Sequence, residues 1–217
     1  SDADRMLRTR ATELILKRRP SGTAQAILQQ VGASQGSARK YLITILARLD
    51  DRGLVEKIWQ MQASRHATER ELGVDILLAF PLARSKRYVI ELLGNESRDV
   101  RYLSLQKLIG EQKEGEKLTP EARGHLETML GDSDERIRLR CIERLSKEPN
   151  RMLVDTLLQR LLYEEYNVKK TILAKLEEFM LQHDFNLVDD LLPLLSQDDD
   201  MIRSSVLSIC AKQGDPV

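Results

Sequence analysis

The second half of the chain repeats one pattern of apolar, polar and charged positions four times. In each copy a leucine precedes a polar and mostly acidic turn, which is followed by a β-branched residue and then a cation. The spacings between successive β-branched residues are 37, 31 and 34, which is the period of stacked helix pairs. The pattern therefore predicts a helical repeat. These β-branched anchors are Val100, Ile137, Val168 and Ile202.

Apolar residues after each turn recur at spacings near 3, 4 and 7, as they do on the buried face of a helix. The stretches between them are also predicted to be helical, at 88–93, 120–130, 151–162 and 187–195. Thr119 and Pro120 form the expected N-cap and first residue of one such helix. A single pair of helices cannot bury its apolar stripe, so we expect the pairs to stack into an α-solenoid. The predicted fold class is mostly all-α.

The turn sequences resemble those of HEAT repeats, which carry an Asp-x-x-Val-Arg pattern at the start of the second helix. Residues 83–217 fit four such repeats, and the third departs most because its turn reads Tyr163-Glu164-Glu165-Tyr166. The resemblance implies a scaffold with protein partners along the repeat surface, and it leaves the partner open. No polar capping helix follows the last repeat, so we expect truncation from a larger parent chain, or a homo-oligomer.

The first 66 residues have a different pattern, with three helices followed by a strand at Leu54–Trp59. This order resembles a winged helix-turn-helix domain, with residues 67–82 as a connecting helix. The alternative is an additional early repeat, because residues 31–39 align with residues 93–101 at an offset of 62, near twice the repeat period. The sequence leaves both interpretations open.

The winged-helix resemblance implies a recognition helix that enters the major groove of double-stranded DNA. Glutamine can pair with adenine, and arginine or lysine with guanine or phosphate. A site between residues 34 and 65 is therefore expected. The candidate DNA-binding residues are Ser34, Gln35, Ser37, Arg39 and Lys40, with Arg65 in the wing.

Charge is distributed unevenly, although the net charge is zero. Residues 1–66 carry 12 Lys and Arg against 6 Asp and Glu, and residues 67–217 carry 22 against 28. A basic front and an acidic remainder suggest different partners for the two regions. No apolar run approaches the length of a membrane span, so we expect no membrane association.

Catalytic motifs are missing from the sequence, so we expect a non-enzymatic scaffold without cofactor or metal. Asp198-Asp199-Asp200 is interpreted as a capping turn, and Cys141 and Cys210 as small core residues. The favoured function is macromolecular interaction with DNA contact, and the alternative is a purely protein-docking module. A HEAT-like DNA-repair glycosylase is a weaker alternative. We expect a cytoplasmic location, or a nuclear one in a eukaryote.

Overall fold

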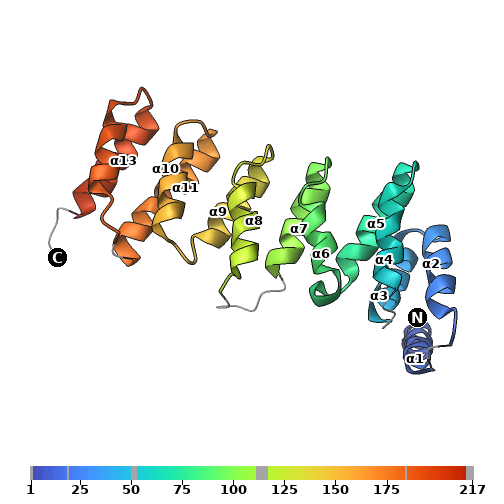
Figure 1. Cartoon of the computed structure of the whole chain (residues 1–217). Coiled ribbons are helices and arrows are strands. Elements are labelled where there is room, and N and C mark those ends of the chain that lie inside the picture. The colour runs from blue at the N-terminus through green and yellow to red at the C-terminus, as the bar shows by residue number, and fades with distance from the viewer. Residues whose placement is uncertain (1, 19, 50–52, 111–116, 184, 214–217) are drawn as a thin grey trace. The chain divides into compact units, whose positions relative to one another are not determined.

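The computed structural model describes residues 2–18, 20–49, 53–110, 117–183 and 185–213, and within them every regular element is a helix (Figure 1). The all-α class is therefore confirmed. The chain divides into two compact units, Ser1–Lys113 and Glu114–Val217, which are described separately. This division differs from the predicted domains at 1–66 and 83–217.

The first unit consists of seven α-helices and one short 3-10 helix in its described part. Helices α2 and α3 form an antiparallel pair, and α6 and α7 form another. Helix α5 packs against α3, α4, α6 and α7. The elements are α1 (Asp2–Arg18), α2 (Thr23–Ala33), α3 (Gly36–Arg48), α4 (Leu54–Trp59), η1 (Gln60–Ala63), α5 (Ala67–Ala79), α6 (Leu82–Leu92) and α7 (Arg98–Gly110).

One hydrophobic core runs through α2, α3, α4, α5 and α6. Val31, Leu46, Ile58, Leu77 and Phe80 are fully buried in it. Helix α5 supplies central residues of this core, whereas residues 67–82 were predicted to connect two domains. Residues 67–82 lie inside the first unit, where Val74, Ile76 and Leu77 of α5 are buried in its core.

The strand predicted at Leu54–Trp59 is wrong, because these residues form helix α4. Leu54, Val55 and Ile58 are buried, whereas Glu56 and Lys57 are exposed. This spacing places the apolar residues on one face of a helix, while a strand would place Glu56 on the same face as Leu54 and Ile58. No strand is present in the described part of the first unit, so the wing has no counterpart there.

The described residues of the second unit form three pairs of helical segments. Helices α9, α11 and α13 pack side by side, and each also packs against the segment that precedes it. The anchors Ile137, Val168 and Ile202 are buried at the starts of these three helices, as the periodicity predicts. The elements are α8 (Pro120–Met129), α9 (Glu135–Leu145), α10 (Arg151–Leu161), α11 (Tyr166–Gln182), α12 (Val188–Leu191), η2 (Leu192–Ser196) and α13 (Asp200–Gln213).

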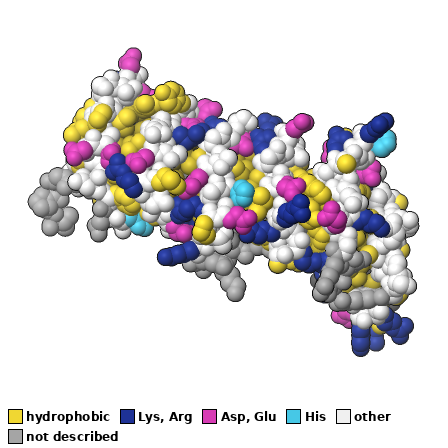
Figure 2. Space-filling model, viewed as in Figure 1, with side chains coloured by type: hydrophobic (Ala, Val, Ile, Leu, Met, Phe, Trp, Pro, Cys, Tyr) yellow, Lys and Arg dark blue, Asp and Glu magenta, His cyan; other side chains and the backbone are white. Residues whose placement is uncertain are grey.

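Polar side chains cap these helices as the sequence predicts. The Thr119 hydroxyl accepts a hydrogen bond from the Ala122 N–H at 3.2 Å. Within the aspartate run, the Asp199 carboxylate accepts one from the Ile202 N–H at 3.1 Å and another from Lys169 at 2.8 Å. Capping therefore accounts for Asp199. Figure 2 shows acidic and basic side chains interspersed on the visible surface, with hydrophobic ones gathered over α10, α11 and α13.

An arginine early in several helices donates a hydrogen bond back to a carbonyl of the turn before it. Three of these bonds are 2.8–2.9 Å long: Arg70 to Ser64, Arg101 to Asn95, and Arg138 to Asp132, each six residues earlier. The other two are Arg203 to Gln197, also six residues earlier, at 2.5 Å, and Arg39 to Ser34, five residues earlier, at 2.6 Å. These residues are called the turn arginines: Arg39, Arg70, Arg101, Arg138 and Arg203.

Arg138 also links one turn to the next. Its Nε bonds to Glu164 at 2.8 Å and its Nη2 to Glu165, while the side chains of Arg138 and Glu164 are each only 6% exposed. Lys169 makes the corresponding link to Asp199. The prediction that these cations pair with acids of a neighbouring turn is confirmed at Arg138 and Lys169, whereas Arg203 pairs with acids of its own turn.

We expect Arg138→Ala to lower the free energy of unfolding of the second unit by about 3 kcal/mol, because it removes one partner of the buried Glu164 carboxylate. Hydrogen exchange of α9 and α11 measures this loss. Arg140→Ala is the matched control on the same helix. It removes an exposed ion pair with Glu143 and should change stability by less than about 0.5 kcal/mol. Equal protection in both variants would contradict the assigned role of Arg138.

Glu148 joins the end of α9 to the start of α8. Its carboxylate accepts hydrogen bonds from the Leu118 N–H at 3.0 Å and from Arg144 at 2.9 Å, and Arg123 lies 3.8 Å away. Partial burial alone would raise the pKa of Glu148, but Arg144, the Leu118 N–H and Arg123 together hold that pKa below its ordinary value of 4.5.

A lowered pKa in the folded state makes the Glu148 contribution complete above pH 4.5 and progressively lost as the pH falls through the folded-state pKa. We therefore expect Glu148→Gln to destabilise the second unit at pH 7, with a difference from the wild type that shrinks below pH 4.5. Urea unfolding followed by circular dichroism across pH 3–7 measures it. A difference independent of pH would exclude the charged contacts as its origin.

Candidate functional site

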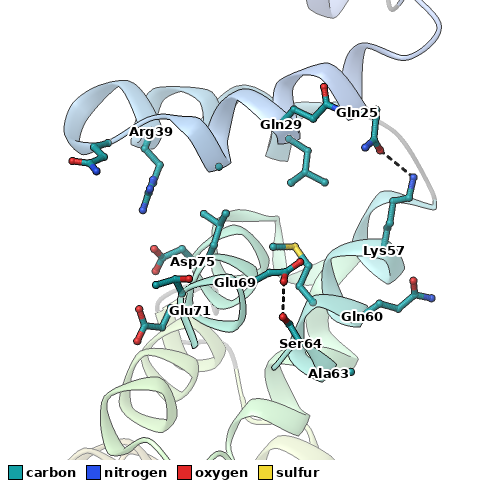
Figure 3. A pocket seen from close by; sticks show the side chains of 16 residues that line it. Gln25, Gln29, Arg39, Lys57, Gln60, Ala63, Ser64, Glu69, Glu71 and Asp75 are labelled. Atoms are coloured by element: carbon teal, nitrogen blue, oxygen red, sulfur yellow. Dashed lines mark hydrogen bonds between the residues drawn. The ribbon is translucent and has the colours of Figure 1, made fainter. Parts of the chain in front are cut away.

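A cleft of about 1200 Å³ lies in the first unit, between α2 and α3 on one side and α4, η1 and α5 on the other (Figure 3). We call it the first cleft. Its lining is mainly polar, although Leu28, Met61 and Leu72 contribute apolar surface. The polar and charged residues of the lining include Gln25, Gln29, Gln35, Gln60, Arg39, Lys57, Ser64, Glu69, Glu71 and Asp75.

Four glutamines line the first cleft. Gln25 and Gln29 are four residues apart on α2, so their side chains lie on the same face of that helix. The Gln25 side-chain oxygen Oε1 accepts a hydrogen bond from Lys57 Nζ at 3.1 Å, which joins the two walls at one end of the cleft (Figure 3). Each amide carries both donors and acceptors, so this wall can meet either kind of group.

Charged groups of both signs meet at the other end, where Arg39 of α3 faces Glu71 and Asp75 of α5 (Figure 3). Withdrawal from water raises the pKa of the Asp75 carboxyl even though the side chain stays partly exposed. Arg39 and Lys40 oppose this effect, and the negative charge of Glu71 adds to it. Asp75 therefore remains a weaker acid than an ordinary surface aspartate.

The start of α5 is fixed at the rim of the cleft by Ser64. Its hydroxyl donates to the Glu69 carboxylate at 2.5 Å and accepts from the His66 N–H at 3.1 Å. At the same wall, a Cβ atom at Gly73 would lie 2.7 Å from the Gln62 amide nitrogen and 3.3 Å from the Ile58 carbonyl oxygen. The absence of a side chain at Gly73 therefore lets α5 approach η1 and α4 closely.

The six candidate DNA-binding residues do not form one group. Gln35 and Arg39 line the first cleft. Ser37 and Lys40 are exposed on α3 outside the lining, and Arg65 is exposed between η1 and α5. The last candidate, Ser34, is half-buried, and its carbonyl is the group that accepts the hydrogen bond from Arg39.

Arg39 therefore has a structural contact of the same kind as the other turn arginines. The sequence contains a signal for this assignment, because Arg39, Arg70 and Arg101 are separated by exact spacings of 31 residues. The prediction from sequence missed Arg70, and it also missed the cleft residues Gln25, Gln29 and Asp75. The spacing of four between Gln25 and Gln29 places them on one helix face, but it does not identify what they face.

Nucleophilic and metal chemistry have no evident site in the described ranges. Burial raises the pKa of the Cys141 thiol to about 12, so this thiol is protonated at neutral pH and unreactive. No group of three His, Cys, Asp or Glu side chains within those ranges is placed to hold a metal ion. Nor does any helix described there have the length and apolar character needed to cross a membrane.

We expect Arg39→Ala to lower the free energy of unfolding of the first unit by about 1 kcal/mol, because the Ser34 carbonyl loses its partner. Lys40→Ala should change it by less than about 0.5 kcal/mol, since this exposed side chain has no such contact. Urea unfolding followed by the fluorescence of Trp59, the sole tryptophan, measures both. If the Arg39→Ala variant were as stable as the wild type, the structural role assigned to Arg39 would be wrong.

Comparison with known proteins finds no protein-family model and no curated protein that matches the chain. The geometry and chemistry of the first cleft are therefore the basis for a function.

Proposed function

We propose that the chain is a non-enzymatic helical-repeat scaffold, similar to HEAT-repeat proteins, that docks an extended polypeptide segment in the first cleft. The observation that carries this proposal is the open cleft of about 1200 Å³ with four glutamines and charges of both signs in its lining. Helix pairs and the turn arginines support the repeat interpretation of both units, and the buried anchors support it in the second.

The amides favour a polypeptide because an extended backbone presents N–H and C=O groups in alternation. A glutamine side chain can accept from one and donate to the other. Gln25 and Gln29 lie one helical turn apart on α2, and Gln60 of η1 belongs to the opposite wall of the same cleft (Figure 3). Groups held in place by helices bind with less loss of conformational freedom.

The charges of the cleft argue against duplex DNA as its occupant. Phosphate contacts dominate the affinity for DNA and require cations. Here Glu69, Glu71 and Asp75 outnumber Arg39 and Lys57, and Arg39 already bonds a turn carbonyl. The exposed candidates Ser37, Lys40 and Arg65 lie outside the cleft, so DNA contact through them is a separate outcome of the test below.

Selection of random 12-residue peptides on the full chain tests the proposal. We expect selected peptides to lose about thirtyfold in affinity for the Gln25→Ala/Gln29→Ala double variant, which removes two hydrogen bonds worth roughly 1 kcal/mol each. Gln30→Ala is the matched control, because Gln30 is exposed on the same helix and does not line the cleft.

DNA binding, the competing function, is measured with a labelled 20-base-pair duplex at low and high salt. DNA binding would replace peptide docking as the function if two results were found together. The duplex would have to bind in a salt-sensitive way that is lost in Lys40→Ala/Arg65→Ala, and the selected peptides would have to bind equally well after the Gln25 and Gln29 changes. Peptide binding that depends on the two glutamines, with no specific loss of DNA binding in the lysine and arginine variant, supports the proposal.

A further inference from the structure

A second cleft of about 650 Å³ lies on the other side of α5, against the turn between α6 and α7. Its lining includes one aromatic side chain, Trp59, and three carboxylates, Glu71, Glu91 and Glu96. Glu71 also lines the first cleft, so the two clefts meet at this residue of α5.

The indole of Trp59 is held in a fixed place at this cleft. Tyr88 of α6 packs against it with ring centroids 5.1 Å apart, and the Tyr88 hydroxyl donates a hydrogen bond to the Glu56 carboxylate. An aromatic ring beside carboxylates attracts a cation in two ways, through its negative π-face and through Coulomb interaction with the acids. The guanidinium of arginine or the ammonium of lysine can make both interactions, with the ring face and with the carboxylates.

The arginines near these acids make their direct contacts with backbone carbonyls or at the exposed surface. Arg70 lines the second cleft, but its guanidinium donates to the Ser64 carbonyl. Arg87 pairs with Glu91 at 3.1 Å from a side chain that is 80% exposed, so that pair is weak. Of the side chains described, none forms a hydrogen bond or ion pair with the carboxylate of Glu71 or Glu96.

We propose that the docked segment is basic, and that one of its arginine or lysine side chains occupies the second cleft on Trp59, among Glu71, Glu91 and Glu96. The proposal rests on the docking function of the first cleft, and it adds the class of partner. Across both clefts five carboxylates face three cations, two of which are turn arginines bonded to backbone carbonyls. A positively charged segment therefore complements the combined surface.

Three synthetic 12-residue peptides test this inference on the full chain. One has arginine at every third position among serine and glutamine, the second has citrulline in place of arginine, and the third has glutamate there. Citrulline keeps the shape of arginine and removes its charge. Because Trp59 is the sole tryptophan, its emission reports on the second cleft directly.

We expect the arginine peptide to bind about tenfold tighter than the citrulline peptide, as for a hydrogen bond to a charged group, and to change Trp59 emission. The Glu71→Gln/Glu96→Gln variant should abolish the preference, whereas Glu13→Gln, on the exposed surface of α1, should keep it. Trp59→Phe, followed by anisotropy of a labelled peptide, should weaken arginine binding severalfold. Circular dichroism verifies that each variant is folded.

The outcomes separate this inference from the docking function. Equal affinity for the arginine and citrulline peptides, or a preference for the glutamate peptide, would overturn it. Selected peptides that depend on Gln25 and Gln29 but contain no excess of lysine or arginine would also overturn it, and would leave the docking function intact. Selected peptides that bind independently of the glutamines contradict the docking function instead.

Discussion

The bond between a turn arginine and a carbonyl of the preceding turn is the interaction on which the local architecture depends. The carbonyls at the end of a helix and in the following turn lack partners within the helix, and leaving them unsatisfied is costly where water is excluded. A guanidinium has five donors in a rigid plane, so Arg138 can bond a carbonyl and two glutamates of the next turn together. Lysine has a single charged head, and Lys169 accordingly bonds Asp199 of the following turn.

The sequence predicted the structure correctly where apolar residues recur with helical spacing over a long segment. It predicted wrongly where a short apolar run is compatible with both a helix and a strand. Ile137, Val168 and Ile202 were predicted to be buried because each begins an apolar face that spans nine residues with helical spacing, which does not fit the alternation of a strand. Residues 54–59 offer only six positions, and β-branched and aromatic residues there favoured a strand. Residues 54–59 form a helix that packs against α5 and α6, and such contacts with other parts of the chain are not visible in a short sequence pattern.

The clefts were beyond sequence reasoning because each is made by side chains from separate helices. The excess of six positive charges in residues 1–66 suggested a basic site, yet a net charge does not say which side chains share a surface. The acids of the first cleft come from α5, which begins after that region, whereas Arg39 is occupied by a carbonyl. Arg39, Arg70 and Arg101 are spaced by 31 residues in the sequence, but the prediction assigned Arg39 to DNA and did not use this spacing.

Helix α5 belongs both to the core of the first unit and to the proposed binding surface, because one of its faces is buried and the other lines the clefts. Ile76 and Leu77 are completely buried and join the core of the first unit, while Glu71 and Asp75 project into cleft space from the other side. A helix fixed by its core cannot turn these carboxylates away without exposing apolar surface. The same constraint that stabilises the unit therefore presents its acids in a fixed arrangement, and such preorganised groups select a partner by charge at a low cost in conformational entropy.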